Sequence, residues 1–124
     1  MSENACACVT GPKLIFACSG AADVGAIADQ AARKLTKDGA GKMYCTAGIG
    51  GRVSGIMATT ESAAKILAID GCPLNCVKSS LDQAGFKTYE HLQLADLGME
   101  KGKTPLTPEA ITKVSTAGAA KLVC

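Results

Sequence analysis

The sequence contains no tryptophan, and its two tyrosines and two phenylalanines bring the aromatic share to 3% of 124 residues. Proteins that bind single-stranded nucleic acid commonly stack bases on aromatic side chains, and this chain offers few such platforms. Its formal charge of +2 is small, and no cluster of lysine and arginine is interleaved with aromatic residues. We therefore expect no nucleic-acid partner.

Long apolar runs are also missing. No stretch approaches the roughly 20 apolar residues that a membrane-spanning helix needs, so we expect no membrane partner. The amino terminus, Met-Ser-Glu-Asn-Ala-Cys, has neither the basic nor the apolar region of a secretory signal. We therefore expect a cytoplasmic protein, in a compartment whose reducing conditions disfavour disulfides.

Cysteine, in contrast, is abundant, with seven residues in the chain. An odd number in a reducing compartment argues against a disulfide framework. At this density in a cytoplasmic domain, cysteine favours metal binding or thiol chemistry.

The length of the chain is that of one domain with a single core. We expect a flexible lead over residues 1–12, which contains Cys6-Ala-Cys8, and one α/β metal-binding domain over residues 13–124. Short apolar runs alternate with helical patterns after this lead. The predicted strands cover residues 13–18, 42–47, 66–69 and 88–94, and the predicted helices cover 21–37, a short segment ending near 60, 72–84 and a last segment from 108.

This alternation is typical of a parallel sheet covered by helices. We expect a three-layer α/β domain whose four-stranded, mostly parallel sheet has the order 2-1-3-4, as in flavodoxin-like or Rossmann-like domains.

Four cysteines stand where predicted strands end. Cys18 ends the first strand, Cys45 lies near the end of the second, and Cys72 and Cys76 follow the third. Because the carboxyl ends of parallel strands meet at one edge of a sheet, we expect the four thiols to converge there. Four thiolates satisfy tetrahedral zinc, and the same four could hold an iron–sulfur cluster. The alternative is that they are small buried apolar side chains.

The segment Asp70-Gly-Cys-Pro-Leu-Asn-Cys76 is the most unusual part of the chain. Proline suits the first position of a helix, which predicts Cys72 at the N-cap and Cys76 one turn further on the same face. Thiolates are favoured at such a position. An alternative function is therefore a thiol, persulfide or selenium transfer enzyme with Cys72 as its nucleophile, which Cys76 could resolve.

Three segments carry a resemblance to a known family: Cys18-Ser-Gly-Ala-Ala-Asp-Val-Gly25, Ala47-Gly-Ile-Gly-Gly-Arg-Val-Ser-Gly55 and, above all, Asp70-Gly-Cys-Pro-Leu-Asn-Cys76. Over roughly residues 13–103 the chain resembles the DGC-domain family of zinc-binding proteins. The family's four zinc-binding cysteines map onto Cys18, Cys45, Cys72 and Cys76. The resemblance thus implies a zinc-binding protein, and it implies no particular reaction.

Two residues near these cysteines are candidates for a supporting role. Asp70 could hydrogen-bond nearby backbone N–H groups or orient a ligand, or it could simply form a turn before Gly71. Arg52 ends the glycine-rich segment that begins at Gly48, where it could clamp an anion or offset the charge of four thiolates. The glycines could instead only let the backbone pass close to Cys18 and Cys72.

The remaining cysteines are harder to assign. Cys6 and Cys8 could capture a soft metal or exchange disulfides as accessory thiols, or be incidental thiols of the lead. Cys124 has no evident partner, and neither has His91, the only histidine, in the middle of a predicted strand. The polar loop over residues 96–106 leaves room for a small-molecule or protein partner.

Overall fold

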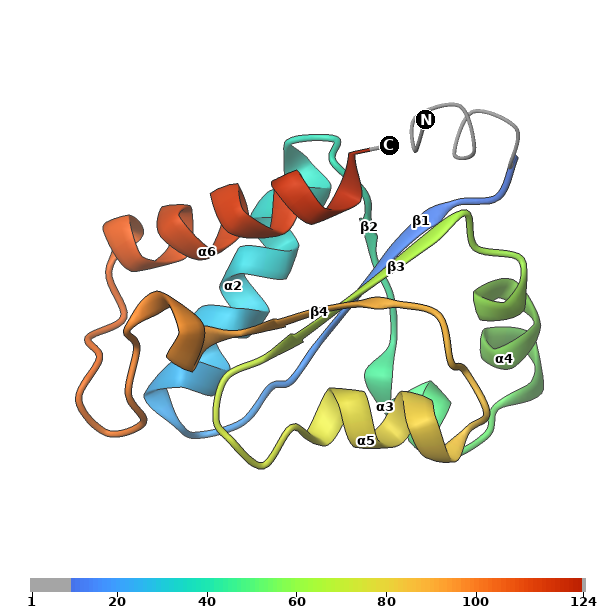
Figure 1. Cartoon of the computed structure of the whole chain (residues 1–124), viewed down its shortest axis with the longest axis horizontal. Coiled ribbons are helices and arrows are strands. Elements are labelled where there is room, and N and C mark those ends of the chain that lie inside the picture. The colour runs from blue at the N-terminus through green and yellow to red at the C-terminus, as the bar shows by residue number, and fades with distance from the viewer. Residues whose placement is uncertain (1–9, 124) are drawn as a thin grey trace.

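The computed structural model describes residues 10–123, in which helices cover both faces of a four-stranded sheet (Figure 1). The strands are β1 (Lys13–Ala17), β2 (Lys42–Met43), β3 (Lys65–Asp70) and β4 (Glu90–Gln93). The α-helices are α2 (Asp23–Lys37), α3 (Thr46–Gly50), α4 (Ser54–Glu61), α5 (Cys76–Gln83) and α6 (Pro108–Leu122), and η1 (Leu94–Leu97) is a 3₁₀ helix.

The predicted fold class is confirmed. All strand pairs are parallel, and the strand order is β2-β1-β3-β4. The central pair aligns all five residues of β1 with the first five of β3, from Lys13 opposite Lys65 to Ala17 opposite Ile69. Both central strands are almost fully buried, which explains why they are continuous apolar runs without polar alternation.

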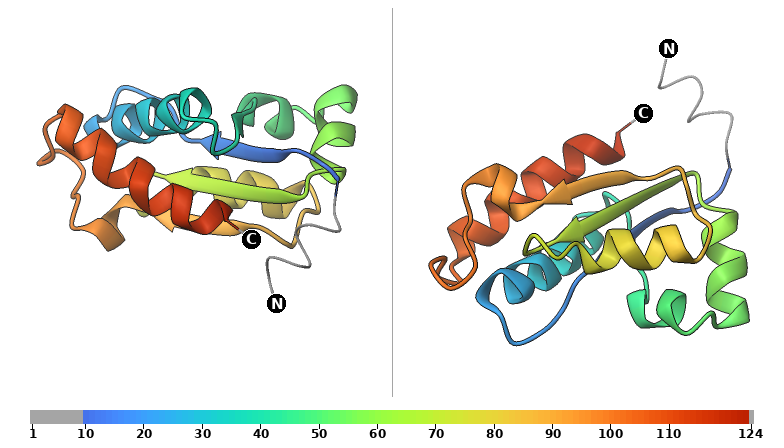
Figure 2. Two further views of the ribbon diagram at one scale, coloured as in Figure 1. Left: turned by 90° about the horizontal axis from the view of Figure 1, so that it is seen from above. Right: turned by 60° about the horizontal axis from the view of Figure 1, so that its bottom comes forward.

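The side chains of the sheet alternate between two cores. On one face, Ile15 and Leu67 pack against α2 and α6. On the other face, Phe16 and Ala68 pack against α3 and α5. Figure 2 shows α5 on the opposite side of the sheet from α2 and α6. In the part of the chain that the structure describes, no helix has both the length and the apolar character needed to cross a bilayer.

The second strand is much shorter than the predicted 42–47 range. It ends at Met43, and a short helix begins at Thr46. The glycine-rich segment after Cys45 therefore starts as a helix. Gly48 is needed for packing between α3 and α4, because a Cβ there would lie 2.7 Å from the Ile56 side chain. This contact explains Gly48 without a close approach to Cys18 or Cys72.

Helix α5 begins at Cys76 and not at the predicted Cys72. The amide of Asn75 donates to the carbonyl of Cys72 at 3.2 Å, so Pro73 occupies the second position of a β-turn, which suits its fixed φ as well as the first position of a helix does. Asn75 then adopts a left-handed conformation, with φ of 54°. Cys72 is therefore the first residue of a β-turn, and Cys76 is the first residue of α5.

Gly71 has a steric reason to be glycine. A Cβ at this position would lie 2.6 Å from the carbonyl oxygen of Val24, in the first turn of α2. We expect Gly71→Ala to destabilise the fold by about 1–3 kcal/mol, the usual cost of overpacking. Urea unfolding measures this loss, and Gly20→Ala is the matched control because a Cβ at Gly20 meets nothing within 4 Å. Equal midpoints for the two variants would contradict the expectation.

The two ends of the described chain lie beside the start of β3. The carbonyl of Pro12 accepts from Ala64 N at 2.7 Å, and Lys65 Nζ donates to the carbonyl of Val123 at 3.0 Å. Cys6, Cys8 and Cys124 lie outside the described residues, so their predicted roles remain predictions.

Candidate thiol site

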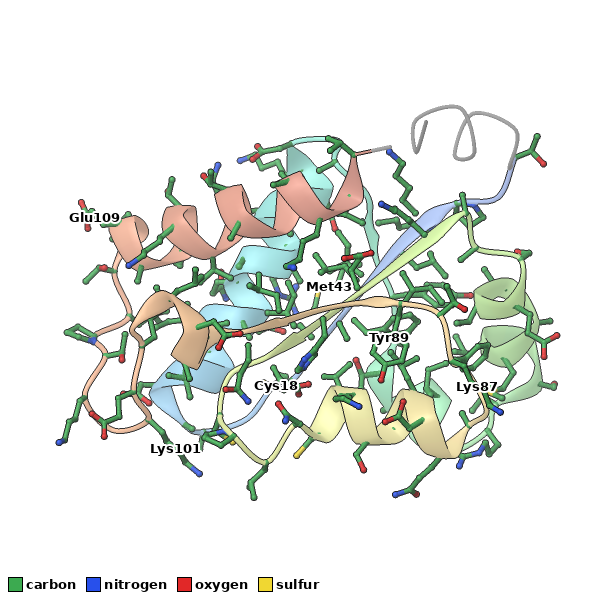
Figure 3. All side chains as sticks on the ribbon, in the orientation of Figure 1. Cys18, Met43, Lys87, Tyr89, Lys101 and Glu109 are labelled. Carbon is green, nitrogen blue, oxygen red and sulfur yellow. The ribbon has the colours of Figure 1, made fainter. Side chains whose placement is uncertain are left out.

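Three of the four predicted cysteines surround the end of β3. Cys18 follows β1, and its Sγ accepts a hydrogen bond from Gly71 N at 3.1 Å. Cys72 comes next in the chain, and Cys76 begins α5 after the turn. Figure 3 shows Cys18 near the beginning of α5. We call the segment from Cys72 to Cys76 the thiol turn.

The electrostatics of Cys18 depend on its burial and on its charged neighbours. Burial raises the pKa of the Cys18 thiol, and the hydrogen bond from Gly71 N opposes this effect. Negative charge on Asp70, Cys72 and Cys76 raises the pKa further. Negative charge near a thiol disfavours its thiolate form, and a cation bound beside it has the opposite effect.

Cys45 stands at the same edge on the other side of Cys18. It precedes the first residue of α3 and is exposed. The hydroxyl of Thr46 donates to the carbonyl of Ala17 at 3.1 Å. This bond ties the residue after Cys45 to the residue before Cys18, and so joins the ends of β1 and β2.

Asp70 acts as the N-terminal cap of α5 although it lies six residues before the helix. Its side chain is 1% exposed, and its two carboxylate oxygens accept from Val77 N at 2.8 Å and Lys78 N at 3.1 Å. These are two of the amides that a helix leaves without a partner in its first turn. No side chain at the adjacent N-cap residue, Asn75, makes this bond. Asp70 therefore fixes where α5, and with it Cys76, begins.

His91 is the site residue that sequence reasoning missed. Its Nε2 lies 2.8 Å from Asp70 Oδ2, within hydrogen-bonding distance. With a carboxylate at Asp70, which only accepts hydrogen bonds, Nε2 would donate this bond. His91 pairs with Ala68 in the neighbouring strand, which puts it on the face of the sheet that Asp70 shares. The alternation of polar and apolar residues in the predicted strand was the available signal for His91. This pattern does not identify Asp70 as its partner.

The second polar residue of β4 contacts the thiol turn itself. Gln93 Nε2 donates to Asn75 Oδ1 at 2.6 Å and lies 3.4 Å from the carbonyl oxygen of Cys72. The turn is thus held to the edge strand by a side chain.

Arg52 makes its contacts away from this cluster. Its guanidinium donates to the carbonyls of Ile49 and Gly50, at 2.8 and 3.2 Å, so it satisfies the carboxyl end of α3 while Cys45 stands at the opposite end. Its exposed side chain thus serves a structural contact, and its predicted anion-binding role remains a prediction.

The four thiols suit zinc in chemistry but not in spacing. Sulfur ligands match tetrahedral zinc, and an N–H group directed at Cys18 Sγ is suited to a thiolate. Across residues 10–123, however, no three cysteine, histidine, aspartate or glutamate side chains are arranged to hold a metal ion. The ligand types therefore fit zinc, but in this conformation the side chains are not close enough together to coordinate one ion.

The loop after η1 is fastened to the same edge by Asp23, the first residue of α2. The amides of Gly102 and Thr104 donate to its carboxylate at 2.9 and 3.0 Å, and these bonds lower the pKa of the Asp23 carboxyl. Lys101 lies in this loop (Figure 3). The predicted polar loop over residues 96–106 is thus attached at its middle to α2.

A lowered carboxyl pKa predicts that the attachment depends on pH. It should be complete above the ordinary carboxyl pKa of about 3.9 and be lost as pH falls through the lower pKa of the folded protein. The protection factors of the Gly102 and Thr104 amides, which correct the exchange rates for the intrinsic effect of pH, measure the release between neutral pH and about pH 2. Asp23→Asn should abolish its pH dependence, and retention in that variant would contradict the assignment.

Comparisons with known proteins agree with the motifs. The sequence profile of the DGC domain matches residues 14–117. The chain is 39% identical over 88 residues to the anaerobic and virulence modulator AnvM of Pseudomonas aeruginosa strain PAO1, which covers 71% of this chain and 67% of the relative. No solved structure matches the chain.

Proposed function

Because this chain belongs to the DGC domain family, we propose that it binds one zinc ion with the thiolates of Cys18, Cys45, Cys72 and Cys76. The observation that carries the proposal is the cluster at the end of β3, where Cys18 Sγ accepts an N–H bond from Gly71, Cys72 follows directly in the chain, and Cys76 begins α5. A cation placed among these thiols relieves their repulsion.

Zinc binding requires the thiols to draw together from their present spacing. Two features of the chain allow this movement. Cys45 and Cys76 are both exposed, so neither sulfur has to leave a packed core. Cys76 also follows a turn that lies outside the strands and is held to β4 by the side chain of Gln93.

The role of the bound ion is the less specific part of the proposal. The relative AnvM is named as an anaerobic and virulence modulator. We propose that this chain is also a modulator, and we do not extend the anaerobic or virulence part of that name to it. The zinc-bound thiol edge would then be the part of the molecule that a small-molecule or protein partner recognises.

A thiol-transfer activity is the second candidate function, with Cys76 in place of Cys72 as the nucleophile. The sequence-based argument for Cys72 depended on a helix N-terminus, and the structure puts Cys76 there, exposed and first in α5. Helix N-termini favour thiolates. Cys76, rather than Cys72, is therefore the residue to test for fast alkylation.

One experiment separates these functions. The protein is purified without air, and its metal content, acid-labile sulfide and visible absorption are measured per chain. One zinc per chain without colour supports the proposal. Sulfide with visible absorption would establish an iron–sulfur cluster in its place, and no metal together with one fast-reacting thiol at Cys76 would establish the second candidate.

A further inference from the structure

The thiol turn is held from the side by strand β4, which itself carries no cysteine. We infer that His91 and Gln93 are positioning residues that set the geometry of Cys72 and Cys76. This inference deepens the proposed function, since it concerns the same thiols. It rests on hydrogen bonds that run from β4 to each end of the turn.

The first connection runs through Asp70. His91 Nε2 contacts Asp70 Oδ2 at 2.8 Å, and the same carboxylate accepts from Val77 N and Lys78 N. Asp70 therefore lies between the strand and the first turn of α5. Loss of the histidine donor leaves a buried carboxylate with only the helix amides, so the carboxylate and the helix start can shift together.

The second connection is direct. Gln93 Nε2 donates to Asn75 Oδ1 at 2.6 Å and lies near the carbonyl oxygen of Cys72. Asn75 is one of two non-glycine residues with positive φ in the described chain. Its left-handed backbone reverses the chain between Cys72 and Cys76, so a bond to its side chain holds the turn at its bend.

The strand holds the two ends of the turn by different routes. His91 acts through Asp70, which lies two residues before Cys72 and caps the helix that Cys76 begins. Gln93 contacts Asn75 and the carbonyl of Cys72 directly. Residues that orient metal ligands in this way typically change metal affinity about 10–100-fold when they are replaced. We expect effects of that size, although neither side chain supplies a sulfur.

Tyr89, the residue that precedes β4, provides a matched control. Its hydroxyl donates to Asp82, which lies in the last turn of α5, and Figure 3 shows Tyr89 beside the part of α5 farther from Cys18. Tyr89→Phe thus removes a bond between the segment that leads into β4 and the same helix, at the end of α5 away from the thiols. A general loosening of β4 against α5 would affect both variants alike.

The test compares His91→Phe, His91→Gln and Tyr89→Phe in the full chain with two measurements. The first is the affinity for zinc alone, which should fall about 10–100-fold in His91→Phe, recover in part in His91→Gln because glutamine retains an N–H donor, and stay unchanged in Tyr89→Phe. The second is the alkylation rate of Cys72 in zinc-free protein, located by mass spectrometry. We expect it to rise several-fold in His91→Phe only, because the half-buried thiol is released.

Equal behaviour of His91→Phe and Tyr89→Phe in both measurements would overturn the inference. If His91→Phe does not fold, Gln93→Leu replaces it, with the same expectations, because it removes a partly exposed contact to the turn. The two proposals fail separately. Wild-type protein that binds no zinc contradicts the proposed function, and the alkylation rates still decide whether β4 positions the turn.

Discussion

Replacement of Asp70 by alanine should be the most damaging single change to the fold that the thiol site offers. It removes a buried acceptor from Val77 N, Lys78 N and His91 Nε2 at once. Each buried donor left without a partner costs about 1–3 kcal/mol, and the loss of a helix cap alone costs about 1 kcal/mol. We expect the free energy of unfolding in urea to fall by roughly 3–5 kcal/mol.

Asp38→Ala is the matched control for this prediction. Asp38 is exposed and makes an i,i+4 ion pair with Lys34, so its removal should cost no more than about 0.5 kcal/mol. If Asp70→Ala unfolded at the same urea concentration as Asp38→Ala, Asp70 would not be the cap that holds α5.

Replacement of Cys72 or Cys76 by serine should have the largest effect on zinc. Each variant removes one sulfur ligand, and we expect the zinc affinity to fall by more than about 100-fold, beyond the usual effect of losing an orienting residue. Competition titration against a chromophoric chelator measures this loss. The exposed side chain of Cys76 makes the serine variant nearly neutral for stability, within about 0.5 kcal/mol.

Cys124→Ser is the control for the removal of a thiol as such. It should keep the wild-type zinc affinity, because the proposal gives Cys124 no part in the site. Wild-type affinity in both the Cys72 and the Cys76 variants would remove these residues from the list of ligands.

The sheet could be predicted because its two central strands are buried on both faces. A continuous apolar run such as Ile66 to Ile69 is best accommodated as a central strand of a small α/β domain. Helix α2 could be predicted from the helical spacing of its apolar residues. The end of β2 could not be predicted in the same way. The run from Met43 to Thr46 is short enough to suit a strand or a turn into a helix, and the packing of Gly48 against Ile56 favours the helix.

Proline was ambiguous for a similar reason. Its fixed φ suits the second position of a β-turn and the first position of a helix equally well. The structure has the turn because Asn75 adopts a left-handed backbone conformation, which prevents a continuous helix from Pro73 to Cys76. Asn75 is a residue type that tolerates this conformation, but no pattern around it indicates that the conformation is used here.

The part of the candidate site that depends on where the strands end could be predicted from the sequence. Cys18 and Cys72 could be assigned to one edge because both follow central parallel strands. The contact between Asp70 and His91 could not be found, because it depends on the register of β3 against β4, which aligns Ala68 with His91. Residues 21 apart in the chain carry no local pattern that pairs them.

The most direct test of the central claim is thiol protection by zinc. Zinc-free protein is titrated with one equivalent of zinc and alkylated, and each cysteine is quantified by mass spectrometry. We predict that Cys18, Cys45, Cys72 and Cys76 become protected together as one zinc binds, while Cys6, Cys8 and Cys124 continue to react. Alkylation of Cys72 and Cys76 at the zinc-free rate in the presence of zinc would contradict the claim.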